Sequence, residues 1–204
     1  YADDLDGNEA AGPYGIALNT GLDAASKSKC RDSPDRAEAM LERISQLHAS
    51  GALDIKPNIR SYNSVINCWA KSNRKDAPDA AQKLLLTMKQ QYLGGDESLR
   101  PDNITYTAVI SGFARAGQAK LAEGLLEEMY SDYLGGNDSA EPNVISFSTV
   151  LDAWSKSKSR DAPQRAEAIL ERMSQLHDSG ALDIKPNIRS YNSVINCWAK
   201  SNRK

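Results

Sequence analysis

The sequence predicts an all-α protein, a solenoid of antiparallel helix-turn-helix repeats. Three observations carry this prediction: a long internal repeat, apolar residues at helical spacing, and prolines and glycines where helices would begin and end. Internal repeats with a period of roughly 20 to 50 residues are typical of solenoids, in which each unit packs only against its neighbours.

The internal repeat is nearly exact, because residues 31–75 recur at 160–204 with all but five positions identical. A shorter motif, a proline followed by Asn or Asp, occurs in both copies and twice between them. These prolines fall in steps of 44, 41 and 44 residues, at Pro57, Pro101, Pro142 and Pro186. The offset between the two copies therefore contains three units.

This period divides residues 1–204 into a single array. The array starts with an eroded unit, 15–58, in which Leu18 replaces the aromatic residue of later units. Its remaining parts are the complete units 59–102, 103–143 and 144–187 and the first helix of a truncated unit, 188–204.

The apolar residues of each unit form two sets at spacings of three and four, which places each set on one face of a helix. In the unit 59–102 these sets are Tyr62, Val65, Ile66 and Trp69, then Ala81, Leu84, Leu85, Met88 and Tyr92. Pro78 and Pro163 stand where second helices would begin, a place that tolerates the missing N–H. Glycines such as Gly95 follow the second helices, so each unit is predicted to be a pair of amphipathic helices.

Composition and motifs exclude several function classes. No stretch approaches the roughly 18 apolar residues of a membrane span, so no membrane association is expected. The chain has no Cys-x-x-Cys, no His-x-Glu and no glycine-rich phosphate loop. We therefore expect no catalytic residue, no metal site, no cofactor and no enzymatic activity. Cys30, Cys68 and Cys197 are interpreted as small fillers, and no targeting segment is visible in what we take to be a fragment.

The helix sequences resemble the pentatricopeptide repeat family. Residues 62–71 read YNSVINCWAK, residues 106–115 read YTAVISGFAR, and the following second helix contains AEGLLEEM. The resemblance covers essentially the whole chain, although its units are longer than is usual in the family. It implies a right-handed superhelix whose concave groove binds single-stranded RNA, one base per repeat, in a mitochondrion or chloroplast.

The resemblance also implies which residues read bases. They are the fifth and the last residue of each unit, all of them small side chains that can donate or accept hydrogen bonds at a base edge. The fifth residues are Asn19, Asn63, Thr107, Ser148 and Asn192, and the last residues are Asn58, Asp102, Asn143 and Asn187. By the family's pairing rules, the four units would prefer 5′-CUAA-3′ or 5′-UUAA-3′.

Two further rows of residues complete the expected RNA site. The second residue of each unit would stack on bases: Ile16, Ile104 and Ile145, with Arg60 and Arg189 in the duplicated unit. The thirteenth residue is always basic and would contact phosphate: Lys27, Lys71, Arg115, Lys156 and Lys200. The net charge of −2 argues against a strong nucleic-acid binder, so this expectation rests on where the basic residues lie.

Each row also has a purely structural interpretation. Asn or Asp after a proline and before a helix is a favoured N-cap, and lysines at the ends of first helices interact with the helix dipole. Two functions therefore stay open. One is a sequence-selective single-stranded RNA-binding module in organellar RNA processing, stability or translation, and the other is a protein scaffold, for example a subunit of an organellar ribosome or other large assembly.

The last helix raises a separate expectation. Tyr191, Val194, Ile195 and Trp198 form its apolar face, and the sequence given holds no second helix after it. An uncovered face of this kind would be a contiguous apolar patch. We expect further repeats or a protein partner to cover it.

Overall fold

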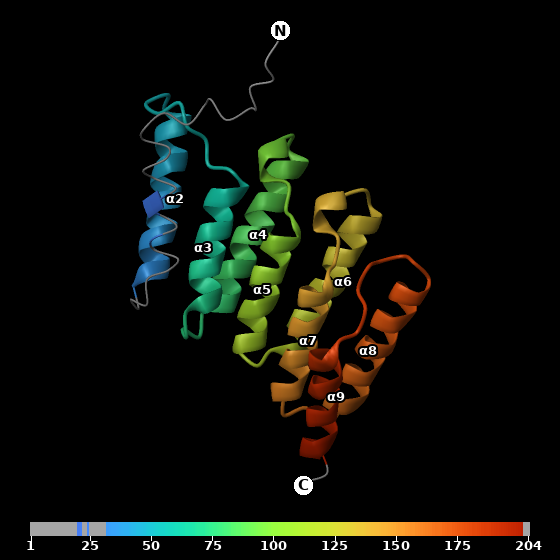
Figure 1. Ribbon diagram of the computed structural model, residues 1–204. Helices are drawn as coiled ribbons and strands as arrows, with labels where there is room; N and C mark the ends of the chain where they lie inside the picture. Colours follow the sequence, from blue (N-terminus) through green and yellow to red (C-terminus); the bar gives the residue numbers. More distant parts are fainter. Residues whose placement is uncertain (1–19, 22–23, 25–31, 202–204) are drawn as a thin grey trace.

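The computed structural model describes residues 20–21, 24 and 32–201 of the chain (Figure 1). Over 32–201 these residues form α-helices joined by short turns and loops, with no strand, and the prediction of an all-α solenoid is confirmed. The α-helices are α2 (Ser33–Ala49), α3 (Ile59–Lys71), α4 (Ala77–Leu93), α5 (Asn103–Arg115), α6 (Ala119–Leu134), α7 (Val144–Lys156), α8 (Ala162–Asp178) and α9 (Ile188–Ser201). Two single-turn 3₁₀ helices, η1 (Glu97–Leu99) and η2 (Asp138–Ala140), lie in the loops after α4 and α6.

The helices form two layers along the array. The first helices α3, α5, α7 and α9 each pack against the next, so equivalent positions on them form a row. Each second helix packs between the first helix of its own unit and that of the following unit, as α4 does between α3 and α5. Figure 1 shows the pairs following one another from one end of the molecule to the other.

Capping fixes where each first helix begins. The Asn58 Oδ1 accepts hydrogen bonds from the backbone N–H groups of Arg60 and Ser61, at 3.0 and 3.2 Å. Asn143 caps α7 in the same way, and Asp102 caps α5 by accepting from the Thr105 N–H alone; each cap is completed by a serine or threonine three residues later. These contacts satisfy N–H groups that have no partner inside the helix. The Pro-Asx pairs are thus start signals for the first layer.

Second helices begin and end at the predicted signals. Pro34, Pro78 and Pro163 occupy the first turns of α2, α4 and α8. Beyond α4, Gly95 has a φ of 100°, a backbone conformation that costs a glycine little. The chain therefore leaves the helix there and turns towards the next first helix.

The predicted apolar faces form one continuous core. Tyr62, Val65, Ile66 and Trp69 are all buried, as are the equivalent residues of α5 and α7. At the tenth position of the first helices the chain has only small residues, and Gly112 there lets α5 approach α3. A Cβ on Gly112 would lie 3.5 Å from the Ala70 Cα. Close packing between units fixes the spacing of the row of first helices.

The 41-residue unit differs from its neighbours mainly in the turn between its helices. That turn spans 116–118, whereas the turns of the 44-residue units span 72–76 and 157–161. Helix α6 is also one residue shorter than α4 and α8. The extra residues of the longer units therefore lie at the end of the hairpin and leave the stacked faces unchanged.

Candidate nucleic-acid interface

The row of first helices brings together a fifth and a last residue that lie far apart in the sequence. Asn63 is on α3 and Asp102 caps α5, and the Asn63 Nδ2 donates to the Asp102 Oδ1 over 3.4 Å. The Thr105 hydroxyl donates to the Asn63 Oδ1 over 2.7 Å. The amide of Asn63 is therefore held in one orientation beside a carboxylate.

One unit further on, the equivalent pair lines a pocket of about 220 Å³. Thr107 and Asn143 lie in its wall together with Ile104 and Ile145, all four of them predicted from sequence as RNA contacts. The remaining lining residues are Asn67, Asn103, Ala108 and Ser111. The pocket thus has two apolar side chains for stacking and several polar groups for hydrogen bonding.

Two hydroxyls in this row are buried without a partner. Among the described residues, neither the Thr107 Oγ1 nor the Ser148 Oγ has a hydrogen-bond partner, although both atoms are inaccessible to solvent. Buried polar atoms are almost always hydrogen-bonded, so an unpaired one calls for a physical reason. Arg100 Nε, Gln118 Oε1 and Asn137 Oδ1 are unpaired in the same way outside this row, so the feature is not specific to it.

The thirteenth residues are available for phosphate. Lys71, Arg115 and Lys156 are exposed, and within the part of the chain that the structure describes they form no ion pair or side-chain hydrogen bond. Many basic residues elsewhere are neutralised, as Lys89 is by Glu128 over 2.7 Å. Lys71, Arg115 and Lys156 thus lie unpaired at the ends of three first helices, while four of the acidic groups on α6, Glu123, Glu127, Glu128 and Asp132, are in ion pairs.

Lys200 differs from the other thirteenth residues. Its Nζ donates to the Ser155 carbonyl oxygen at the end of α7. This contact fits the interpretation that a lysine here offsets the negative end of a helix dipole. The structural role and the phosphate role can coexist only if this side chain can leave the carbonyl.

Comparisons with known proteins identify the repeat. The profile of the PPR repeat matches residues 97–130, and that of the pentatricopeptide repeat domain matches residues 136–201. The chain belongs to the pentatricopeptide repeat family. No curated protein matches the chain significantly.

Solved pentatricopeptide repeat structures share the fold. The chain is similar to the crystal structure of PPR10 in complex with an 18-nt psaJ RNA element, with 22% identity and a TM-score of 0.60. A triple cysteine-to-serine variant of PPR10 with the same RNA element gives the same values. The match covers 92% of this chain and 23% of the PPR10 chain, so the present sequence spans about a quarter of that relative's length.

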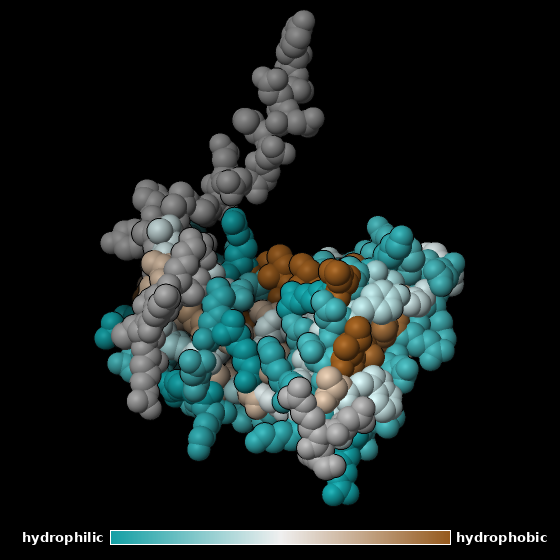
Figure 2. Space-filling model, turned by 60° about the horizontal axis from the view of Figure 1, so that its bottom comes forward, coloured by the Kyte–Doolittle hydropathy of each residue, from teal (hydrophilic) through white to brown (hydrophobic). Residues whose placement is uncertain are grey.

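The predicted base-stacking residues differ in their surroundings. Ile104 and Ile145 are 57% and 62% exposed, as the prediction of a contact with bases requires. Figure 2 shows apolar patches on an otherwise largely hydrophilic face of the molecule. Arg60 is exposed, whereas Arg189 forms an ion pair with Asp152 of α7. Arg189 must therefore break or share that pair to stack on a base.

The last residues of the repeats also have the structural role considered from sequence. Asn58, Asp102, Asn143 and Asn187 all accept backbone hydrogen bonds as N-caps. In the unit 144–187, the fifth residue, Ser148, is only 3% exposed, whereas the last residue, Asn187, is exposed. Asn192, in the truncated repeat, is exposed as well. The predicted Ile16, Asn19 and Lys27 lie outside the described residues.

Sequence reasoning missed three polar residues of the pocket. Asn67 and Ser111 are the ninth residues of their repeats, four positions after the fifth residue and so on the same helix face. Asn103 is the first residue after the cap. The helical spacing from the fifth residue could have identified the ninth position, because the residues there are also polar in every complete repeat: Asn67, Ser111 and Asp152.

Two of the three cysteines fit their interpretation as fillers, and the third, Cys30, lies outside the described residues. Cys68 and Cys197 are buried, and burial raises the pKa of the Cys68 thiol to about 11. Burial also raises the pKa of the Cys197 thiol. Neither sulfur is activated as a nucleophile. Over the described residues, no three His, Cys, Asp or Glu side chains group closely enough to hold a metal ion, and no helix is long and apolar enough to cross a membrane.

Proposed function

We propose that the chain is a sequence-selective single-stranded RNA-binding module that reads one base per repeat. Its proposed setting is organellar RNA processing, stability or translation, in a mitochondrion or chloroplast. The observation that carries the proposal is the pocket between α5 and α7, where Thr107, Asn143, Ile104 and Ile145 meet. The RNA complex of the structurally similar PPR10 supports it.

The proposed mechanism follows from the chemistry of the row. A base enters between the two isoleucines and stacks on them, and its edge meets the Thr107 hydroxyl and the Asn143 amide. The unpaired basic side chains at the thirteenth position contact the phosphates between successive nucleotides. Each base-edge contact discriminates by about 1 to 3 kcal/mol, so a few repeats give selectivity with modest affinity. We expect a preference for 5′-CUAA-3′ or 5′-UUAA-3′.

The double substitution Thr107→Asn with Asn143→Asp tests base reading. It rebuilds at the third repeat the residue pair that Asn63 and Asp102 form at the second, and Asp keeps the N-cap of α7. We expect the preferred third base to change from A to U while the salt dependence stays the same. The measurement is the affinity for four RNAs that differ only in the third base.

A charge control is Gln164→Glu, which adds the same charge on the exposed side of α8 and should leave the third-base preference at A. If the parent and the double variant bound all four RNAs equally, base reading would be disproved. The protein scaffold would then be the better function.

The scaffold has one observation of its own in its favour. On α9, Tyr191, Ile195 and Trp198 are exposed, and Ile188 is 79% exposed. A face of this size suits a protein partner or a further repeat. Such a contact is compatible with RNA binding, since none of these residues lines the pocket of Thr107 and Asn143.

A further inference from the structure

We propose that Thr105 is a positioning residue for base reading, which sets the selectivity of the second repeat for uracil over cytosine. This inference rests on the proposed RNA-binding function and extends it to a residue outside the base-reading and stacking rows. Thr105 is the third residue of its repeat and is completely buried, so it does not contact RNA itself. It acts on the pair formed by Asn63 and Asp102.

The Thr105 hydroxyl bridges the two base-reading side chains of this pair. Its oxygen lies 2.7 Å from the Asn63 Oδ1 and 2.7 Å from the Asp102 Oδ1, so its single hydrogen is shared between these two acceptors. The Thr105 backbone N–H also donates to the Asp102 Oδ1, over 2.8 Å. One residue thus holds both members of a pair that lie 39 residues apart in the sequence.

These contacts decide which atoms are left for a base. The Asn63 Oδ1 faces the hydroxyl and the Nδ2 faces the carboxylate, because the opposite orientation would place two negatively polarised oxygens 3.4 Å apart. Within the described part of the chain, the second N–H of the Asn63 amide and the Asp102 Oδ2 form no hydrogen bond. The pair therefore offers a base one donor next to one acceptor.

This donor and acceptor fit uracil better than cytosine. Uracil presents a carbonyl oxygen next to its N3–H group, whereas cytosine presents an amino group next to an unprotonated N3. The Asn63 N–H would donate to the uracil oxygen, and the Asp102 carboxylate would accept from the N3–H. Against cytosine, each of the two groups would face a group of its own kind. Rotation of the Asn63 amide would remove this discrimination, so its position is decisive.

The third residue of the next repeat acts differently. Ser146 occupies the place of Thr105, and its hydroxyl donates to the backbone carbonyl oxygen of Asn143 over 2.7 Å. It also accepts from the Asn143 N–H over 3.0 Å, so it completes the cap of α7. No hydrogen bond joins it to Thr107, whose hydroxyl has no partner among the described residues. Capping a helix and bridging a base-reading pair are therefore separable roles of the third residue.

The decisive variant is Thr105→Val in the full chain, which keeps the shape of the side chain and removes the hydroxyl. The probes are two RNA oligonucleotides that differ only in 5′-CUAA-3′ against 5′-CCAA-3′. The parent should prefer the first, and Thr105→Val should reduce this preference by about fivefold or more, as expected for one base-edge contact. The matched control, Ser146→Ala, also removes a capping hydroxyl but should leave the preference at the second base unchanged. Circular dichroism verifies that both variants are folded.

A second set of variants tests the same role without removing the Thr105 hydroxyl. In the double variant Thr107→Asn with Asn143→Asp, the third repeat carries the same pair but has a serine at its third position. Adding Ser146→Thr should raise its preference for U over C at the third base. The reason is that a β-branched side chain has fewer rotamers, so its hydroxyl is held towards the pair.

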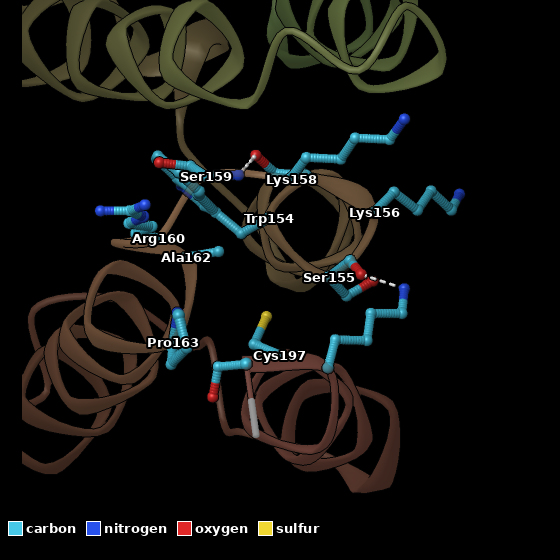
Figure 3. A pocket seen from close by; sticks show the side chains of 12 residues that line it. Trp154, Ser155, Lys156, Lys158, Ser159, Arg160, Ala162, Pro163 and Cys197 are labelled. Carbon is cyan, nitrogen blue, oxygen red and sulfur yellow. Dashed lines mark hydrogen bonds between the residues drawn. The ribbon is translucent and has the colours of Figure 1, made fainter. Parts of the chain in front are cut away.

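Salt dependence separates positioning from a change in how the RNA strand lies. Lys156 ends α7, ten residues or about 15 Å from Ser146 in its first turn. Its charged end points away from the cavity of about 600 Å³ beside the turn 157–161 (Figure 3). None of the substitutions at the third position changes a charge, so each should leave the slope of log affinity against log salt unchanged.

Two results would overturn the positioning role. One is a Thr105→Val variant that keeps the full preference for U or loses affinity for both RNAs equally, and the other is a Ser146→Thr substitution without effect on the rebuilt pair. The proposed function would still stand in either case if the Thr107 and Asn143 variant switched its base. A parent that bound the two RNAs equally would overturn this inference, and the four RNAs that differ in the third base would then decide on the proposed function.

Discussion

At the residue scale, one hydrogen bond links successive repeats. The Trp154 indole donates to the Glu123 carboxylate of the preceding repeat over 2.8 Å, and Trp69 donates to Glu38 over 2.9 Å. Phe113 replaces the tryptophan at the third such position, and Gln82 stands where the glutamate would be. The chain thus contains two solutions, an indole N–H with a carboxylate and a phenyl ring with a neutral amide.

We predict that a double-mutant cycle will detect the hydrogen bond between Trp154 and Glu123. Trp154→Phe removes one of the donors to the buried Glu123, which Arg165 also contacts, and should cost about 1 to 3 kcal/mol of unfolding free energy. Adding Glu123→Gln should restore part of that loss, because it recreates the natural Phe113 and Gln82 pair. We expect a coupling energy of about 1 kcal/mol, measured by chemical denaturation.

The duplicated block supplies the control for this cycle. Glu167 and Trp198 have the same sequence spacing as Glu123 and Trp154, but both are exposed. Glu167→Gln should therefore change the unfolding free energy very little. Additive losses in the cycle at Trp154 would show that the indole contact carries no specific energy.

At the scale of elements, α3 and α9 have the same sequence over 59–72 and 188–201 but different neighbours. Helix α3 packs against α2, α4 and α5, whereas α9 packs against α7 and α8. Trp69 is consequently 3% exposed and Trp198 39% exposed. The burial of an identical helix is thus decided by its place in the array.

We predict a large difference between two identical substitutions. Trp69→Ala should cost about 3 to 5 kcal/mol, because it opens a cavity in a packed core. Trp198→Ala should cost about 1 kcal/mol or less, since much of that side chain is already in water. Denaturation of the two variants beside the parent measures both losses. Equal losses would mean that α9 is covered in solution, for instance by a second molecule.

The helices were predictable from the sequence because period, proline and glycine each act locally. Paired contacts across units were predictable only where the pattern is regular, as for Asn63 with Asp102 and Thr107 with Asn143. The ion pair of Arg189 and the contact of Lys200 with the Ser155 carbonyl depend on single distances between neighbouring helices. A periodic pattern does not encode such distances, and it does not reveal a pocket under a turn.

At the scale of the whole molecule, the array is a linear chain of interfaces. Among the described helices, α5 and α7 each pack against two first helices, whereas α9 packs against one, α7. In such arrays the free energy of unfolding is close to a sum of terms for each unit and for each interface between neighbours. Local unfolding therefore starts at helices with fewer neighbours.

This arrangement predicts a gradient in amide hydrogen exchange. The amides of α5, at the centre, should exchange most slowly, and those of α9 clearly faster. The identical stretches of α3 and α9 compare the two environments without any difference in sequence. Uniform protection along 32–201 would instead indicate that the chain unfolds as one cooperative unit.

The positions at which the duplicated block begins and ends have a consequence for the history of the chain. Residues 75 and 160, the two block boundaries within the described part, lie in the turns 72–76 and 157–161 rather than inside a helix. Unequal crossing-over between the two copies would therefore join turn to turn, and it would preserve the interface between a second helix and the following first helix. Each such event inserts or deletes 129 residues, which correspond to three repeats. Under the proposed function, it lengthens or shortens the recognised RNA sequence by three bases. The number of bases recognised can thus change in steps of three, while the protein stays folded after each event.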